Sequence, residues 1–524
     1  MILKWEDKNE VMKMAVFIIT LSSVLFFNTI PSQRLINNSE NVFYRMISGE
    51  SNLKFPEEFK IGVGGSAYQT EGAWNIDGKS PSNWDVFSHN KNNSIVDGEN
   101  GDVATDSYHK YKEDIKILKD TGFQFYRLSL SWSRILPAGV DNITNNKGIQ
   151  HYKNVLDELH KNGIEPFVTI YHWDHPDVLD QTGGWLNETI VDHFVNYAKI
   201  VFQEFGSRVK FWTTINEPIA YCYWGYGKGA FPIEPSLSKA YRCGYNMLQA
   251  HAKVYHLYND TFRINNSQIG IVNSCWNFYS IDKNDTESSD IAFQYNCGWL
   301  SHPIFTENGD YPDVMIKRIN ENSQLEGLST SRLPILTPQL IQEIKNTADY
   351  FGLNYYTSRI SESIKKSSVN GWFEDSGIKI SENKSWPVDS ASWLQIVPKG
   401  LGDLLRKIKN EYNNPPIYIL GNGLATDLSH NDTSRINYLY SHMEETLLAI
   451  NRDGCNIKGY TVWSLLDNFE WLDGYTKSYG IVHVDHQNLN RPRSPRLSVT
   501  WLKEILKNRQ LMTLNDIYNS SNYH

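Results

Sequence analysis

Eight short apolar segments with the character of β-strands recur along the chain, and stretches with helical periodicity lie between them. The segments are residues 60–67, 124–130, 165–171, 209–216, 268–274, 350–356, 416–420 and 457–464. Residues 108–120, 149–161 and 190–205 carry apolar side chains at a spacing of about 3.6 residues, which indicates amphipathic helices. Alternating strands and helices predict a parallel sheet. Eight such units predict an α/β fold, a single (β/α)₈ TIM barrel with loop insertions.

The length and charge of the chain fit this fold and argue against several classes of partner. One barrel with insertions can accommodate most of the 524 residues. The formal net charge is -9, and the Lys and Arg residues are scattered, so we expect no nucleic-acid partner. We find no dinucleotide or phosphate motif. His172 and His175 lack a nearby third ligand, so we expect neither a cofactor nor a metal.

The N-terminal region resembles a secretory signal. Lys4, Lys8 and Lys13 precede an apolar run over residues 15–27, which predicts a signal peptide at 1–31. Translation from Met12 or Met14 would give a shorter signal, and an uncleaved membrane anchor is the alternative, although the run is short for a span. We then expect a polar segment at 32–52, the barrel at 53–510 and a tail at 511–524. The mature protein is predicted to be secreted and free of the membrane.

Glycosylation sequons and cysteines bear on the same compartment. Asn-x-Ser/Thr sequons include Asn92, Asn142, Asn187, Asn259, Asn284 and Asn431. Their density supports a secreted glycoprotein. The five cysteines are an odd number, so at least one thiol stays free or pairs with another chain, and the sequence does not indicate the pairing.

Polar and aromatic residues follow nearly every predicted strand. In TIM barrels the chemistry takes place where the strands end, at their C-terminal face. The residues at these ends are Gln69, Arg127, His172, Trp173, Asn216, Glu217, Asn273, Asn354, Tyr356 and Trp463. Side chains of this kind hydrogen-bond to polyols or stack on them, so they predict a sugar-binding rim.

Glu217 is the first candidate for catalysis. Glycoside hydrolysis with retention needs two carboxyl groups about 5–5.5 Å apart, one as acid/base and one as nucleophile. Glu217 ends the fourth predicted strand in the segment 213–218 (TTINEP). The neighbouring Asn216 suits a contact with a sugar 2-hydroxyl, a contact that strengthens in the transition state.

Several motifs resemble those of family 1 glycoside hydrolases. They are residues 59–72 (FKIGVGGSAYQTEG), 126–134 (YRLSLSWSR), 171–174 (YHWD), 214–218 (TINEP), 354–356 (NYY) and 463–471 (WSLLDNFEW). The resemblance runs from about residue 55 to 501. It implies a β-glucosidase type of enzyme, acting on O-glycosyl bonds of a small-molecule β-glycoside.

The resemblance also implies a role for each matching residue. Glu217 would be the acid/base, Asn216 would bind the 2-hydroxyl, and Trp463 would form the platform under the sugar ring. The remaining substrate-binding positions are Gln69, His172, Trp173, Asn354, Glu470 and Trp471, and the residues flanking the nucleophile are Arg127 and Tyr356. Because Glu470 would repel a phosphate, the expected substrate is an unphosphorylated β-glucoside.

The chain departs from the family pattern at the nucleophile. The family carries Ile/Val-Thr-Glu-Asn-Gly at the end of the seventh strand, where this chain has residues 416–423 (PIYILGNG), so Gly421 replaces the glutamate. Residues 306–309 (TENG) match the motif better, but we assign Glu307 to the loop between the fifth and sixth strands. Ser478, where the family usually has arginine, is a further departure.

Glycine cannot attack an anomeric carbon, so hydrolysis should be strongly impaired. Loss of a covalent nucleophile costs roughly 10⁶ in rate in a protease triad. Without a second carboxylate, we expect Glu217 to ionise more readily and a small anion to bind near Arg127 in the vacated space. Asp427 or Glu470 would be displaced from the required position, and small displacements are costly.

Four interpretations follow from these features. The protein is a β-glycoside-binding pseudoenzyme, a slow glycosidase or transglycosidase using water or an external nucleophile, or an ordinary β-glucosidase whose sequence is in error at position 421. The fourth is a secreted scaffold that binds no sugar. The aglycone, the choice among glucose, galactose and fucose, and the oligomeric state are left open.

Overall fold

The computed structural model describes residues 53–140, 143–230, 234–364, 375–391, 393–427 and 429–521. The predicted signal peptide, the polar segment at 32–52 and the sequon at Asn142 lie outside these ranges. In the described part of the chain, none of the helices has the length and apolar character needed to cross a membrane.

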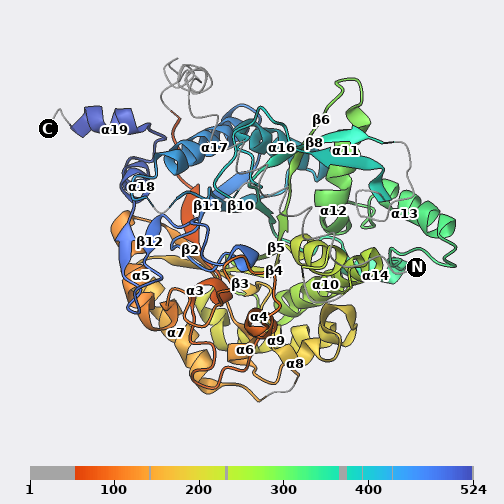
Figure 1. Cartoon of the computed structure of the whole chain (residues 1–524), viewed down its shortest axis with the longest axis horizontal. Helices are drawn as coiled ribbons and strands as arrows, with labels where there is room; N and C mark the ends of the chain where they lie inside the picture. Colours follow the sequence, from red (N-terminus) through yellow and green to blue (C-terminus); the bar gives the residue numbers. More distant parts are fainter. Residues whose placement is uncertain are drawn as a thin grey trace, which may run out of the picture. The chain divides into compact units, whose positions relative to one another are not determined.

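Eight parallel strands close into a barrel at the centre of Figure 1, which confirms the predicted fold. In order around the barrel they are β1 (Lys60–Gly64), β2 (Phe125–Ser129), β3 (Glu165–Tyr171), β4 (Phe211–Asn216), β5 (Gln268–Ser274), β7 (Phe351–Asn354), β10 (Ile417–Asn422) and β11 (Ile457–Trp463). β11 pairs in parallel with β1 and so completes the ring. Seven of the eight predicted segments contain one of these strands, and the segment 416–420 overlaps β10, which extends two residues further to Asn422.

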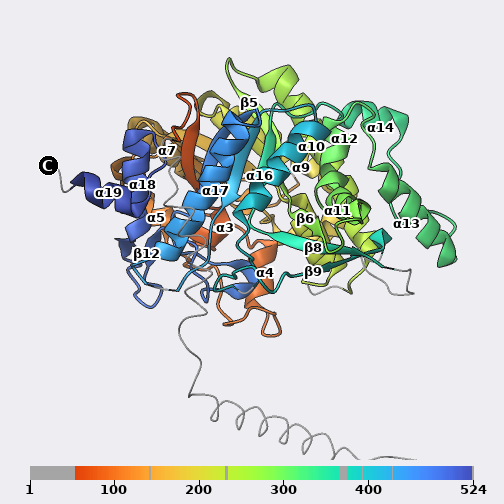
Figure 2. The ribbon, with the colours of Figure 1, turned by 90° about the horizontal axis from the view of Figure 1, so that it is seen from above.

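Helices surround the barrel, as Figures 1 and 2 show. They include α5 (Ser107–Thr121), α7 (Asn146–Lys161), α9 (Thr189–Phe205), α10 (Leu237–Leu257), α16 (Pro398–Glu411), α17 (Thr433–Asn451) and α18 (Leu497–Asn508). The first three confirm the predicted helices. Gly122 ends α5 with φ of 94°, a left-handed conformation that glycine adopts without strain.

Further elements fill the connections between strands and helices. The helices among them are α3 (Ala67–Thr70), α4 (Asn83–His89), α6 (Trp132–Ile135), α8 (Asp177–Asp180), α11 (Thr286–Phe293), α12 (Trp299–Phe305), α13 (Asp313–Leu325), α14 (Pro338–Ile344) and α19 (Leu514–Ser521). Two small sheets were not predicted: β6 (Asn277–Ser280), β8 (Ser358–Ser363) and β9 (Ile378–Ser381) form one, and β12 (Val482–Val484) pairs with β13 (Arg493–Pro495).

Large side chains fill the interior of the barrel below its C-terminal face. The cluster consists of Phe125, Phe167, Phe211, Val272, Tyr350, Tyr418 and Leu420, all buried. Gly62 on β1 makes room for it, because a Cβ atom there would lie 2.5 Å from the Phe125 ring. The barrel is therefore a packed core, and a ligand site can form only beyond the strand ends.

Two disulfides join the connections on one side of the barrel. Cys222 is bonded to Cys243, and Cys275 to Cys297. Cys455 is a free, buried thiol, in agreement with the odd number of cysteines.

A buried ion pair holds the loop that follows β11. The Asp467 carboxylate accepts hydrogen bonds from Arg496, His483 and the Ser478 hydroxyl. Burial opposes ionisation, but the bonds from His483 and Arg496 hold the pKa of Asp467 at about 2. These bonds fix the loop in place, and the same loop carries Glu470.

We expect Arg496→Ala to destabilise the protein by about 3–5 kcal/mol, because it leaves Asp467 buried and without its cation. Chemical denaturation at neutral pH measures this loss. Lys399→Ala, which removes the exposed i,i+4 partner of Asp403, is the control and should cost less than about 1 kcal/mol. Equal losses in the two variants would contradict the importance assigned to the buried pair.

Candidate active site

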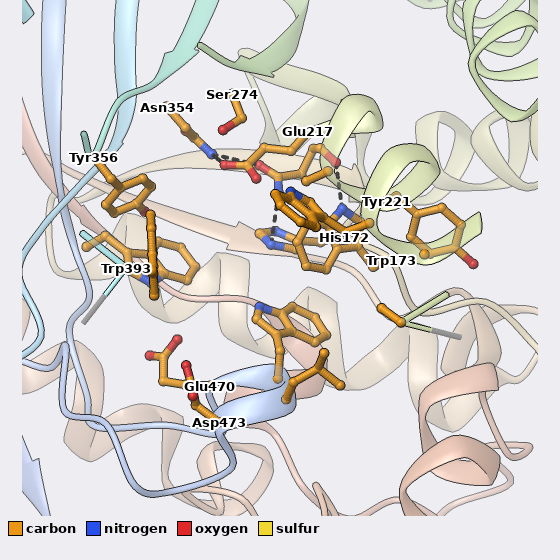
Figure 3. Close-up of a pocket in the computed structure, with 18 of the residues that line it drawn as sticks. His172, Trp173, Glu217, Tyr221, Ser274, Asn354, Tyr356, Trp393, Glu470 and Asp473 are labelled. Atoms are coloured by element: carbon orange, nitrogen blue, oxygen red, sulfur yellow. Dashed lines mark hydrogen bonds between the residues drawn. The ribbon is translucent and has the colours of Figure 1, made fainter. Parts of the chain in front are cut away.

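A cavity of about 490 Å³ opens at the C-terminal ends of the barrel strands. Its lining is rich in tryptophan and tyrosine and contains few charged groups. It consists of Trp84, Arg127, His172, Trp173, Asn216, Glu217, Ala220, Tyr221, Trp224, Gly225, Ala230, Ser274, Trp276, Asn354, Tyr356, Arg359, Trp393, Trp463, Glu470, Trp471, Leu472, Asp473 and Tyr479. In Figure 3, Glu217 and Asn354 lie on one side of the cavity, and Glu470 and Asp473 lie on the opposite side.

Asn216 connects the polar groups on the Glu217 side. Its Oδ1 accepts hydrogen bonds from Arg127 (2.6 Å) and from Asn354 Nδ2 (3.2 Å). Its Nδ2 lies 3.1 Å from His172 Nε2, and its backbone carbonyl accepts a bond from the Trp173 indole. Burial and then the Arg127 charge lower the pKa of His172 far below its ordinary value. The neutral imidazole can therefore accept a hydrogen bond from the Asn216 amide.

Glu217 lies directly beyond the end of β4, where the register between β4 and β5 shifts. Its backbone N–H donates to the Val272 carbonyl (2.7 Å), and Asn354 Nδ2 donates to its carboxylate. Burial raises the pKa of Glu217, while the Asn354 bond and the Arg127 charge oppose this rise. The expected lowering by Arg127 is therefore present, but burial outweighs it and keeps the pKa above the ordinary value.

Arg127 is buried beneath the cavity with 1% of its surface exposed. One guanidinium nitrogen donates to the Leu420 carbonyl (2.6 Å) and another to Asn216. Its Nε is buried and has no hydrogen-bond partner among the described residues. The guanidinium carbon lies 6.0 Å from the centre of the Trp463 ring. Burial lowers the pKa of this arginine, although Tyr356 and Glu217 favour its charge.

Gly421 lies near the end of β10, where the register against β7 shifts between Ile419 and Gly421. A Cβ atom added to Gly421 would lie 2.7 Å from Asn354 Oδ1 and 2.8 Å from the Tyr356 hydroxyl. The space expected to be vacant beside Gly421 is thus closely bounded by these two side chains. By contrast, a Cβ atom on Gly423 would lie 1.9 Å from the Trp463 carbonyl oxygen, a backbone atom.

Glu307 has no part in the cavity. It follows α12, is exposed, and is absent from the cavity lining. The TENG motif therefore lies in the loop between β5 and β7, the fifth and sixth strands of the barrel, as the sequence predicts.

The opposite side of the cavity carries a second carboxyl group. Glu470 Oε2 accepts a bond from Gln69 Nε2 (3.3 Å), and its Oε1 is buried without a partner among the described residues. Burial, and then the charge of Asp473, raises the pKa of Glu470 well above its ordinary value. Gln69, which was predicted to bind substrate, does not line the cavity. Its amide nitrogen also donates to the Asn468 side chain and to the Phe469 carbonyl.

Trp471 packs among aromatic rings beside Glu470. Its ring is nearly parallel to those of Tyr68 and His172, with centroids 6.1 and 6.0 Å away. Three lining residues, Trp173, Glu217 and Trp471, have positive φ angles of 79°, 45° and 55°. Such conformations are strained for residues other than glycine and concentrate at ligand sites.

Much of the cavity mouth was not predicted from the sequence. The unpredicted lining residues include Trp84, Tyr221, Trp224, Ser274, Trp276, Arg359, Asp473 and Tyr479. Trp276 could have been predicted as a lining residue, because it follows the end of β5 by two residues. Asn273, predicted at the rim, instead donates to the Ser301 hydroxyl and does not line the cavity. In the described ranges, no cluster of His, Cys, Asp and Glu could hold a metal ion.

The family profile described as glycosyl hydrolase family 1 matches residues 51–511. The chain belongs to glycosyl hydrolase family 1. Among relatives, it is 42% identical to myrosinase 1 of Brevicoryne brassicae over 87% of this chain and 99% of that protein. It is 39% identical to the cytosolic beta-glucosidase of Homo sapiens over 88% of this chain and 99% of the relative. It is also 41% identical to human lactase/phlorizin hydrolase but spans only 24% of that protein.

Solved structures of family 1 members have the same fold. Aphid myrosinase superimposes with a TM-score of 0.83 at 42% identity, covering 87% of this chain and 99% of that one. The beta-glucosidase from Trichoderma harzianum gives a TM-score of 0.82 at 36% identity, covering 88% and 99%. The similarity to family 1 predicted from the motifs is therefore confirmed.

We expect Glu470→Gln to stabilise the protein at neutral pH. Because burial raises the pKa of Glu470, the folded state retains a proton that the unfolded chain releases above its ordinary pKa near 4.5. Stability of the natural protein therefore falls as pH rises from that value through the raised pKa of the folded state. The amide removes this loss, on the order of 1 kcal/mol or more.

Thermal unfolding measured from pH 4 to pH 8 tests this expectation. The difference between Glu470→Gln and the natural protein should be small at pH 4 and grow toward pH 8. Glu307→Gln, at an exposed glutamate, should track the natural protein throughout. A difference that is independent of pH would show that titration of Glu470 is not its cause.

Proposed function

We propose that this family 1 member binds unphosphorylated β-glucosides in the cavity and hydrolyses their O-glycosyl bonds very slowly. The observation that carries the proposal is the pairing of Glu217, in the cavity wall, with Gly421, which has no side chain at the end of the seventh barrel strand. The site would then have an acid/base and no nucleophile.

The non-reducing sugar would lie between Glu470 and the Trp463 ring. The free Oε1 of Glu470 can accept a hydrogen bond from a sugar hydroxyl, which would satisfy a buried polar atom. Trp463, Trp471 and His172 offer faces and edges that suit a pyranose. In our proposal Gln69 acts indirectly, since its amide orients Glu470.

Glu217 would act on the glycosidic oxygen. Its raised pKa lets it hold a proton for the leaving group, as a general acid must. Transfer of that proton accompanies cleavage of the bond between C1 and the glycosidic oxygen, and the aglycone leaves as an alcohol. With Gly421 opposite, no glycosyl-enzyme ester can form, so water or an external anion must bond to C1 instead.

Asn354 and Tyr356 would limit this replacement chemistry. They bound the space over Gly421 so closely that an anion must displace them before it can reach C1. The unpartnered Nε of Arg127 is a hydrogen-bond donor for such an anion, provided that the side chains move. This close packing favours a second candidate function, namely binding of β-glycosides without turnover.

We further propose that the protein is secreted and glycosylated. The sequon residues Asn92, Asn259, Asn284 and Asn431 are exposed, so each is accessible to a glycosyltransferase. Two disulfides fit an oxidising compartment. The substrate class follows from relatives described as beta-glucosidases and myrosinases.

Gly421→Glu should raise the rate of aryl β-glucoside hydrolysis by orders of magnitude, because it supplies the missing nucleophile. The Asn354 and Tyr356 contacts involve side-chain ends that can rotate away. Gly421→Ala is the matched control, since it displaces the same groups without adding a carboxylate, and should give no gain. Steady-state kinetics with p-nitrophenyl β-glucoside measure all three proteins.

Formate or azide should restore part of the activity in the natural protein but add little to Gly421→Glu. The anion replaces a nucleophile that the variant already has. Equal hydrolysis rates of the natural protein and Gly421→Glu without added anion would refute the impaired-enzyme proposal. If Gly421→Glu binds an iminosugar yet gains no activity, the missing carboxylate is not what limits turnover.

A further inference from the structure

The cavity changes character from its floor to its mouth. Arg127, His172 and Trp463 are 1%, 4% and 7% exposed, whereas Trp393 and Trp224 are 38% and 47% exposed. A sugar placed beside Glu470 and Glu217 occupies the buried part. The group attached to its anomeric oxygen must therefore extend toward the exposed aromatic residues.

One part of this mouth comes from a π-helical segment. The segment η3 (Ala220–Gly227) begins three residues after Glu217, and it contributes Ala220, Tyr221, Trp224 and Gly225 to the lining. Cys222 lies within it, is fully buried, and is absent from the lining. Its disulfide to Cys243 joins the segment to α10.

A second part of the mouth has the same construction. Ser274 and Trp276 line the cavity, and Cys275 between them is buried and bonded to Cys297. Cys297 belongs to another π-helical segment, η5 (Gln294–Gly298). From η5 the Asn296 side chain also accepts a hydrogen bond from the Trp276 backbone N–H (2.7 Å).

We propose that these two disulfides are positioning elements that set the affinity for aromatic aglycones. Each bond attaches a cavity-lining segment to an outer helix, immediately beside the residues that face the ligand. The proposal rests on the proposed function, because it requires a β-glycoside whose aglycone reaches Trp224 and Trp276. The cysteines themselves do not contact the ligand.

The physical basis is preorganisation of the tryptophans. π-helical segments are rare, and the Cys222–Cys243 bond joins η3 covalently to α10. Binding an aryl group to a loosened wall must also order the indole of Trp224, which lowers affinity. The cost of ordering one or two such side chains on binding corresponds to a roughly tenfold weaker Kd.

Binding of two ligands separates the mouth from the floor. The probes are an aryl thio-β-glucoside, which reaches the mouth, and deoxynojirimycin, which has no aglycone. Calorimetry gives both Kd values for the natural protein, for Cys222→Ser/Cys243→Ser and for Cys275→Ser/Cys297→Ser. We expect roughly tenfold weaker binding of the aryl ligand in each double variant and unchanged binding of the iminosugar.

Two controls make the result specific. Cys455→Ala removes the free thiol and should change neither Kd. Trp224→Ala should weaken binding of the aryl ligand when both disulfides are intact. Removing the Cys222–Cys243 bond from this variant should then weaken binding little further, because both changes act through one side chain. If a double variant does not fold, as thermal unfolding will show, the same ratio is measured on natural protein reduced under native conditions.

Each outcome has one meaning. Unchanged aryl affinity after loss of both bonds, or equal weakening of both ligands, overturns the positioning role. Fully additive effects of Trp224→Ala and disulfide removal overturn the assignment to Trp224. Failure of the natural protein to bind deoxynojirimycin instead contradicts the proposed function.

Discussion

A buried guanidinium that has no carboxylate partner among the described residues organises the floor of the cavity. Arg127 on β2 binds the Leu420 carbonyl of β10 and the Asn216 side chain of β4, so its charge is stabilised by neutral acceptors from two other strands. Burying a cation is costly unless it is well hydrogen-bonded. The same charge helps to keep His172 neutral and opposes the rise of the Glu217 pKa. The protonation states around Asn216 therefore depend on burial together with the charge of this side chain.

Strand positions were predictable because each barrel strand is a compact apolar run that ends in polar or aromatic residues. Burial on both faces removes the alternation of surface strands but leaves length and composition as signals. The sheet of β6, β8 and β9 escaped prediction for the opposite reason. Its strands have four to six residues each and lie in two separate connections, β6 between β5 and β7 and the other two between β7 and β10, so their pairing depends on the folded barrel rather than on local sequence.

The floor of the cavity was predictable from motifs, whereas its mouth and its detailed contacts were not. Tyr221 and Trp224 come from a π-helical turn, which matches neither helical nor strand periodicity. Side-chain packing also overrode the expected gap at Gly421, because Asn354 and Tyr356 lie where a longer residue would project. Burial likewise outweighed the predicted effect of Arg127 on Glu217, and a sequence alone does not give the depth of a carboxyl group.

Gly421, in β10, and Gly423, just beyond its end, differ in the substitutions that the structure tolerates. Gly423 is locked by the main chain of the neighbouring strand, since any side chain there would collide with a carbonyl oxygen. Gly421 faces only rotatable side-chain ends, and its backbone φ is not in the left-handed region reserved for glycine. A side chain at position 421 is therefore compatible with the backbone of the barrel once two neighbouring side chains rotate, whereas one at position 423 would require a strand to move.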